Sequence, residues 1–307
     1  MSSLEYNAGK WDTPMGCIEG GWNQIQFKKE CDLKVPFVFV TDRNLVFHCL
    51  RAAYTLIKYK KPGYNMAVIV YVSGDFGTPD GNIPAECRFM DSMDPECAFR
   101  MSVFPKDILD RLTKLNSFTG RLPWTCGRWF VPYLVKGPDA AFYVDSDIMF
   151  IGDVVNLLED KGIRLDGNLP IVSASSDEFS DGSVLPVDYR NAGFLLLNLK
   201  KCISDGFTEK LEAAMPDYQY GCLDQECLNA VYKDELLKVK LPKFVNFTVT
   251  KFGDLSYEDE RRIVGLHFTG EKKYGNDGFE YRSPFSHRFI YESWIYESEI
   301  EKFKGMS

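Results

Sequence analysis

The fold of this chain is decided by the stretch Ala140-Ala141-Phe142-Tyr143-Val144-Asp145-Ser146-Asp147-Ile148-Met149-Phe150. Its first apolar run follows Gly137-Pro138 and predicts a buried strand. The run ends in two carboxylates, Asp145 and Asp147, which are one residue apart. In an α/β sheet these side chains would lie at the carboxyl edge of the strand, where such sheets bind ligands. Two carboxylates at that place suit a hard divalent cation that also holds substrate phosphates.

Short apolar runs alternate with segments of helical spacing along the chain. We predict strands at 35–41, 66–72, 98–104, 140–145, 171–174, 192–199, 236–241 and 264–268, and helices at 44–60, 105–115, 124–135, 205–214 and 222–232. Residues 74–97 have no period and predict a loop. This alternation predicts an α/β fold, with a largely parallel sheet flanked by helices.

Composition excludes several classes of function. The 307 residues carry a formal net charge of −8, which argues against a nucleic-acid binder. The nine cysteines have no zinc-like spacing, residues 1–10 lack an apolar signal region, and no apolar run approaches the roughly 18 residues of a membrane span. We therefore expect reduced thiols, a cytoplasmic location and no membrane span. Without a secretory route, the sequon Asn246-Phe247-Thr248 is interpreted as a coincidence in a strand-like stretch.

Six short elements follow one another in a fixed order. They are Val40-Thr41-Asp42-Arg43-Asn44, Arg128, Asp145-Ser146-Asp147, Asn191-Ala192-Gly193, Leu223-Asp224-Gln225-Glu226 and His267-Phe268-Thr269-Gly270-Glu271-Lys272-Lys273. Over roughly residues 36–275, this combination resembles the retaining GT-A glycosyltransferases of family 8. That family includes bacterial lipooligosaccharide galactosyltransferases and glycogenin.

The resemblance implies a metal site and a diphosphate site. Asp145, Asp147 and His267 would hold Mn²⁺, with Mg²⁺ as the alternative, because a nitrogen ligand beside carboxylates favours manganese over calcium. Gly270 would let the backbone approach the diphosphate, and Lys273 would neutralise it. The sequence departs from the family after this lysine, where Tyr274 and Gly275 replace the usual proline and tryptophan. Without this context, a histidine after an apolar strand is more often structural.

The resemblance also implies contacts to the nucleoside and the sugar. The positions that match the uracil contacts are Thr41, Asp42 and Asn44, Arg128 matches a residue that contacts donor sugar and phosphate, and the sugar-binding or catalytic positions are Asn191, Asp224, Gln225 and Asp177. Each has a simpler interpretation. Asp42 and Asn44 suit an Asx turn and a helix cap, Arg128 suits a helix surface, and Asp177 suits a loop.

The resemblance implies one GT-A domain at residues 36–275, with a nucleotide-binding half at 36–150 and an acceptor-binding half at 151–275. An N-terminal arm (1–35) and a C-terminal extension (276–307) flank it, and the extension predicts a helix packed on the body rather than on a membrane surface. The implied reaction moves a hexose from UDP-galactose or UDP-glucose to a hydroxyl of a glycan or other acceptor, with α linkage. The sequence names neither the sugar, the acceptor nor an oligomeric state.

Three alternatives belong to other classes. One is a self-glycosylating protein like glycogenin, and another is a non-catalytic module that binds nucleotide sugars. The third is a phosphatase of the D-x-D-x-T type, which Met149 disfavours because that class has threonine or valine there.

Overall fold

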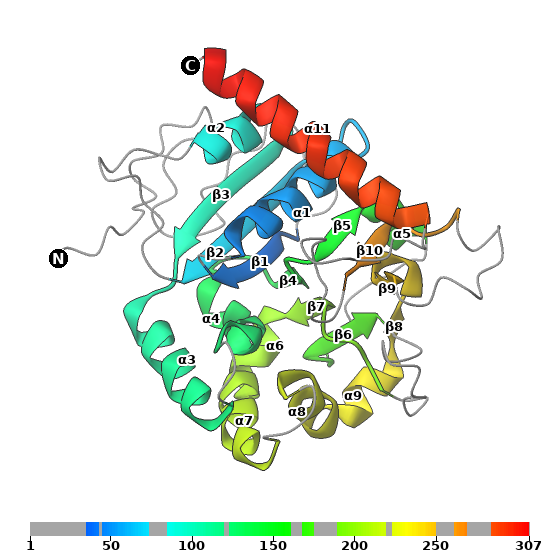
Figure 1. Cartoon of the computed structure of the whole chain (residues 1–307). Helices are drawn as coiled ribbons and strands as arrows, with labels where there is room; N and C mark the ends of the chain where they lie inside the picture. Colours follow the sequence, from blue (N-terminus) through cyan, green and yellow to red (C-terminus); the bar gives the residue numbers. More distant parts are fainter. Residues whose placement is uncertain are drawn as a thin grey trace.

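The computed structural model describes residues 35–42, 45–73, 85–119, 123–160, 168–174, 189–218, 223–249, 261–268 and 284–306. In these residues a mixed sheet of seven strands has helices on both faces, and a second sheet has three strands (Figure 1). The large sheet contains β1 (Phe37–Asp42), β2 (Met66–Ser73), β3 (Cys97–Val103), β4 (Ala140–Val144), β6 (Ile171–Ala174), β7 (Phe194–Asn198) and β8 (Lys240–Leu241). The small sheet contains β5 (Ile148–Phe150), β9 (Phe247–Thr248) and β10 (Gly265–His267). The predicted α/β class is confirmed.

The large sheet has the strand order β3-β2-β1-β4-β7-β6-β8. The strands from β3 to β4 are parallel, as predicted, whereas β7 runs antiparallel to both β4 and β6. The reversal has a consequence for the site, because the amino end of β7 meets the carboxyl end of β4. The backbone N–H of Asp145 donates to the carbonyl of Gly193 across 2.8 Å.

Side chains of the central strands alternate between two cores, as expected from the period of two in a strand. Phe39, Phe142 and Phe194 belong to one core, while Val40, Tyr143 and Leu195 belong to the other. The covering elements are α1 (Val46–Lys58), α2 (Ala85–Ser92), α3 (Lys106–Thr119), η3 (Pro123–Phe130), α4 (Val131–Leu134), α5 (Val154–Asp160), α6 (Leu199–Ser204), α7 (Phe207–Ala214), η4 (Met215–Asp217), α8 (Asp224–Val231), α9 (Lys233–Lys238), η5 (Lys243–Val245) and α11 (Pro284–Met306).

Two local predictions were wrong, and a third was right in place but not in helix type. The segment predicted as a loop contains α2, whose eight residues bury Cys87, Phe89 and Met90 on one side. The predicted helix at 124–135 is present, as a 3₁₀ helix that continues as the short α4. The predicted strand at 236–241 is mostly α9, and β8 keeps only two residues.

The C-terminal helix α11 packs on the body, as predicted. In Figure 1 it lies across the top of the molecule, beside α1 and α2. Its own residues Tyr296 and Ile300 are buried against the body. Its buried Glu292 carboxylate accepts hydrogen bonds from Lys58 Nζ at 2.7 Å and Tyr59 Oη at 2.5 Å. No helix among the described residues is long and apolar enough to cross a membrane.

The small sheet depends on a close backbone contact at Gly265. A Cβ built on Gly265 would lie 2.0 Å from the Val245 carbonyl oxygen. We predict that Gly265→Ala lowers the free energy of unfolding by about 2–3 kcal/mol, since the backbone must move apart.

Urea unfolding followed by circular dichroism measures this loss. Gly305→Ala is the matched control, because nothing lies within 4 Å of a Cβ at that position. It should be neutral or stabilising by up to about 1 kcal/mol, as expected for Gly→Ala in a helix. Equal stabilities of the two variants would contradict the prediction.

Candidate metal and sugar-binding site

The topology brings four chain segments to one edge of the large sheet. Asp145 follows β4, and the antiparallel β7 returns Gly193 to the same point. After Asp145, the chain turns through Ser146 and Asp147 into β5. This strand pairs with β10, so that His267 lies opposite Ile148. The backbone N–H of Phe268 donates to the Asp147 carbonyl at 3.0 Å, which fixes the end of β10 beside the two carboxylates.

Asp145, Asp147 and His267 form a candidate metal centre. Each offers one ligand atom, and these three atoms all lie within 4.8 Å of one another. His267 Nε2 is 3.1 Å from Asp147 Oδ1 and 3.6 Å from Asp145 Oδ2. Two ligands at about 2.1 Å from one ion, at right angles, lie about 3 Å apart, so this spacing fits a shared cation.

Two neighbours orient the Asp145 carboxylate. The Tyr143 hydroxyl donates to Oδ1 at 2.5 Å, and Arg128 Nη2 lies 3.1 Å from the same oxygen. Burial raises the pKa of Tyr143 well above its ordinary value, and the negative charge of Asp145 raises it further. The phenol therefore keeps its proton and acts as a donor. With Oδ1 engaged in this way, Oδ2 faces His267 and can bind a cation.

Arg128 joins the metal carboxylate to Asp224. Its Nε lies 3.0 Å from Asp224 Oδ2 and donates to the Thr125 carbonyl, and its Nη1 donates to the Ala192 carbonyl at 2.6 Å. Burial alone would lower the pKa of Arg128, but Asp145 and Asp224 raise it overall. The simpler interpretation of Arg128 as a helix-surface residue is wrong, since it is only 8% exposed.

The ionised form of the Asp224 carboxyl group is disfavoured in this network. It begins α8 and is 6% exposed, and burial raises its pKa from 3.8 to about 6, although Arg128 acts in the opposite direction. The like charge of Asp145 contributes to this rise. Perturbed carboxylates of this kind are frequent at functional sites.

Asn191 and Gln225 lie on either side of the turn before β7. Asn191 Oδ1 accepts the N–H of Gly193 at 2.7 Å, and Gln225 Oε1 accepts the N–H of Ala192 at 2.8 Å. Gln225 Nε2 donates to the Tyr189 hydroxyl at 3.0 Å. The structure therefore brings Asn191, Asp224 and Gln225 together around one turn.

The predicted nucleoside contacts lie at the end of β1. Thr41 and Asp42 are buried, and Asp42 Oδ1 accepts the backbone N–H of Leu45 at 2.9 Å, just before α1. The turn that the simpler interpretation predicted for Asp42 is thus present. The other predicted site residues, Asn44, Asp177, Gly270 and Lys273, lie outside the described residues.

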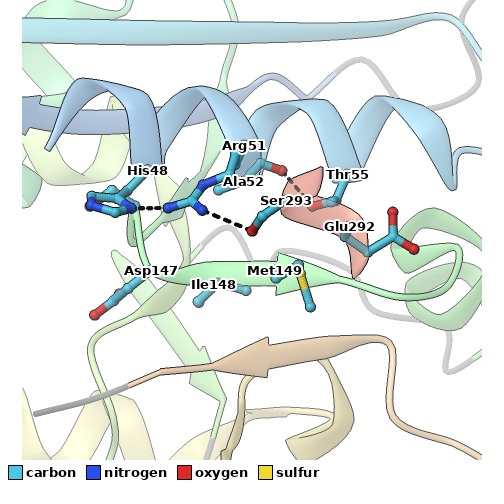
Figure 2. Close-up of a pocket in the computed structure, with 10 residues that line it drawn as sticks. His48, Arg51, Ala52, Thr55, Asp147, Ile148, Met149, Glu292 and Ser293 are labelled. Carbon is cyan, nitrogen blue, oxygen red and sulfur yellow. Dashed lines mark hydrogen bonds between the residues drawn. The ribbon is translucent and has the colours of Figure 1, made fainter. Parts of the chain in front are cut away.

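A small pocket lies on the α1 side of the segment that carries Asp147 (Figure 2). Its lining comes from α1, residues 146–149 and α11. Arg51 Nη1 donates to Ser293 Oγ at 2.8 Å, and Thr55 Oγ1 accepts the backbone N–H of Phe150 at 3.0 Å. These contacts attach β5 to α1 and α1 to α11. The C-terminal helix therefore supports the strand that follows the metal carboxylates.

Comparison with known proteins identifies the fold. No family model matches the chain. It is 31% identical over 144 residues to the glycosyltransferase GlyE of Streptococcus pneumoniae (serotype 4), which covers 46% of this chain and 31% of GlyE. Among solved structures, the bifunctional WbbM glycosyltransferase superposes with a TM-score of 0.61 and 20% identity, over 88% of this chain and 51% of WbbM. The galactosyltransferase LgtC, solved with donor and acceptor sugar analogues, superposes with a TM-score of 0.61 and 16% identity, over 85% of this chain and 96% of LgtC.

The chain has a GT-A-type fold. It spans about a third of the curated GlyE protein, so the comparison with GlyE concerns only part of that molecule. In the GT-A frame, the Asp145-Ser146-Asp147 triplet lies after the central strand β4, where the sequence predicted it. Its charge suits a cation, because the site holds three carboxylates, Asp145, Asp147 and Asp224, but one guanidinium, Arg128, which contacts Asp145 and Asp224. A divalent cation would balance the remaining two negative charges.

Sequence reasoning missed two residues of this GT-A site. Tyr143 could have been found, because it is two residues before Asp145 and so points to the same side of the strand. Gly193 entered the sequence analysis only as part of the element Asn191-Ala192-Gly193, with no role of its own. In the structure, a Cβ at this position would lie 2.5 Å from His267 Cε1.

We predict that Asp224→Asn makes the metal-free protein more stable at pH 7.5. The pKa of Asp224 is higher in the folded protein than in the unfolded chain, where the group therefore ionises first. The free energy of unfolding consequently falls as the pH rises from 3.8 to about 6. Removing this charge should raise the free energy of unfolding at pH 7.5 by roughly 1–3 kcal/mol, which corresponds to an increase of a few degrees in Tm.

Thermal unfolding at pH 4 and pH 7.5 measures the effect. The gain should be small at pH 4, where the wild-type carboxyl group is mostly protonated in the folded state. A variant that melts below the wild type at pH 7.5 would show that the ion pair with Arg128 outweighs the cost of burial.

Proposed function

We propose that this protein is a metal-dependent retaining glycosyltransferase of family 8. It would move a hexose from a UDP-sugar, UDP-galactose or UDP-glucose, to a hydroxyl of a glycan or other acceptor. The observation that carries the proposal is the convergence of Asp145, Asp147 and His267 at the carboxyl edge of β4 in a GT-A-type fold. GlyE and LgtC are glycosyltransferases by name, which supports the class of reaction.

Asp145, Asp147 and His267 would hold the cation, for which we propose Mn²⁺ because the set contains a nitrogen ligand. When bound, the cation would serve as a Lewis acid that neutralises charge on the departing nucleoside diphosphate. Tyr143 and Arg128 would keep the Asp145 carboxylate in its orientation during this change.

The sugar would lie between Asn191 and Asp224. Asp224 is a buried carboxylate that can accept from sugar hydroxyls, and the Asn191 amide nitrogen can donate to one. Arg128 contacts Asp224 and Asp145 at once, so it couples the sugar end of the site to the metal end. Gly270 and Lys273 would contact the diphosphate, Asp177 the sugar, and Thr41, Asp42 and Asn44 the uracil ring.

Retention of configuration requires either a carboxylate nucleophile or attack from the face of the leaving group. The residue at the matching position is Gln225, whose amide is a poor nucleophile. Its carbonyl oxygen is also engaged with the backbone N–H of Ala192. We therefore propose attack from the same face, with an oxygen of the departing diphosphate taking the proton of the acceptor hydroxyl.

A panel of UDP-sugars, assayed for UDP release with and without Mn²⁺, tests the proposed function. Release from a UDP-hexose that needs the metal supports it, whereas no release and no binding of any UDP-sugar would contradict it. Intact mass of the same reactions tests the glycogenin-like alternative. A ladder of hexose increments would show that the chain is its own acceptor.

We predict that Asp147→Asn abolishes Mn²⁺-dependent binding of UDP and leaves the fold intact. An amide is a much weaker ligand than a carboxylate, and Asp147 supplies one of three protein ligands. Isothermal titration of UDP with and without Mn²⁺ measures this.

Asp139→Asn is the matched control, since Asp139 lies at the opposite end of β4 from Asp145 and its side chain is 69% exposed. This variant should bind UDP as the wild type does. If Asp147→Asn retained Mn²⁺-dependent binding and wild-type turnover, the metal site would be elsewhere.

We also predict that the new glycosidic bond, or the hexose first released by hydrolysis, has the α configuration. The coupling constant of the new anomeric proton in NMR reads this directly. Gln225→Ala should slow the reaction about 10- to 100-fold without abolishing it, a loss of roughly 1.4–2.8 kcal/mol in transition-state stabilisation. A β product would contradict both the family and the same-face mechanism, and complete loss in Gln225→Ala would indicate a nucleophile.

A further inference from the structure

We propose that Asn246 is a positioning residue, which orients the Asn191 side chain toward the donor sugar. The inference rests on the proposed function, because it concerns the sugar-binding role of Asn191. Asn246 follows η5 and precedes β9, on a segment far from Asn191 in the sequence. Its Nδ2 donates to Asn191 Oδ1 at 2.7 Å, and the Asn246 residue is 1% exposed.

The orientation of both amides follows from a backbone donor. The N–H of Gly193 can only donate, and it lies 2.7 Å from one side-chain atom of Asn191, which must therefore be the oxygen. The group of Asn246 that faces the same oxygen must then be its amide nitrogen. Asn191 Oδ1 thus accepts two hydrogen bonds within the protein. Its Nδ2 has no hydrogen-bond partner among the described residues and remains for a ligand.

Stability alone does not explain an asparagine at this position. Asn246 Oδ1 is buried and has no hydrogen-bond partner among the described residues. A buried carbonyl without a partner costs about 1–3 kcal/mol, which an apolar residue of similar size would avoid. Of the two polar groups of this amide, only the nitrogen has a hydrogen-bond partner among the described residues, and that partner is Asn191. The arrangement fits a residue that is present for the geometry of its neighbour.

The same contact links the sugar side of the site to the metal side. A Cβ on Gly193 would lie 2.9 Å from Asn191 Oδ1 and 2.9 Å from His267 Nδ1, so the three groups meet at one point. Asn246 precedes β9, which pairs with β10 and places Thr248 opposite His267. Asn246, just before β9, and His267, at the end of β10, therefore lie on adjacent segments and reach the same turn. The interpretation of the sequon as a coincidence agrees with the structure, because Nδ2, the atom that glycosylation modifies, is buried and bonded to Asn191.

The test measures the affinities for UDP and for UDP-hexose separately, both with Mn²⁺ present. Asn191 would contact the sugar, so Asn246→Ala should weaken UDP-hexose binding about 10-fold relative to UDP binding. A purely structural role would change both affinities alike. The isosteric Asn246→Asp should have at least the same effect, because it places an acceptor oxygen against Asn191 Oδ1.

Two comparisons make the result specific to Asn191. In an Asn191→Ala background, Asn246→Ala should have no further effect on the ratio of the two affinities, because the residue it positions is gone. Asn65→Ala is the matched control, since Asn65 is also 1% exposed but precedes β2, at the opposite edge of the sheet. It should leave the ratio unchanged even if it lowers Tm.

An unchanged ratio in Asn246→Ala, with wild-type binding of UDP-hexose intact, would overturn this inference and leave the proposed function standing. Equal ratio changes in the Asn191 and Asn191→Ala backgrounds would also overturn it. A wild-type protein that binds no UDP-sugar would overturn the proposed function and this inference together.

Discussion

The candidate site depends on the hydrogen bond between the Asp145 N–H and the Gly193 carbonyl. It joins the carboxyl end of a strand to the amino end of its antiparallel neighbour, and so places a metal carboxylate beside the turn that holds Asn191. The approach is possible only because residue 193 has no Cβ. A side chain there would collide with the ring of His267 and with the Asn191 oxygen. One glycine thus determines how closely the proposed metal ligands and the proposed sugar-binding residues can be arranged.

Electrostatics gives this arrangement its chemistry. Arg128 is buried between Asp145 and Asp224 and cannot neutralise both of them together with Asp147. Burial is the main cause of the raised pKa of Asp224, and the like charge of Asp145 adds to it, so this cluster of carboxylates is unfavourable in the absence of a cation. A site of this kind would exchange stability for function, because a bound divalent cation would balance its charges. The helix α11 contributes from behind, through Ser293 and Arg51, to holding α1 and the strand after the carboxylates.

Much of the fold was predictable because the central strands are buried on both faces and read as continuous apolar runs. The D-x-D triplet was predicted as a cation site from its place after an apolar run, whereas His267 joined it only through the family resemblance, because a histidine after an apolar strand is more often structural. The antiparallel direction of β7 was not predictable from residues 192–199, because a fully buried strand looks the same in either direction. The helix α2 was missed because it buries only three residues, which are separated by polar ones, so its sequence shows no clear apolar period.

The contacts that sequence analysis did not predict are those between distant segments. Arg128 matched a family position, but its contact with Asp224 joins residues 96 positions apart, and no local pattern encodes that contact. Asn246 was dismissed as a chance sequon, since its role depends on the pairing of β9 with β10 and on the turn at Gly193. Local periodicity predicts elements, whereas such contacts follow only from how the elements pack.

The central claim is that Asp145, Asp147 and His267 bind one divalent cation together with a nucleoside diphosphate. A crystal structure with Mn²⁺ and UDP, with anomalous diffraction recorded at the manganese edge, tests it most directly. The account predicts a single strong peak at coordination distance from one oxygen of each carboxylate and from His267 Nε2, in contact with the diphosphate. A manganese peak elsewhere, or bound UDP with no cation between these three side chains, would contradict it.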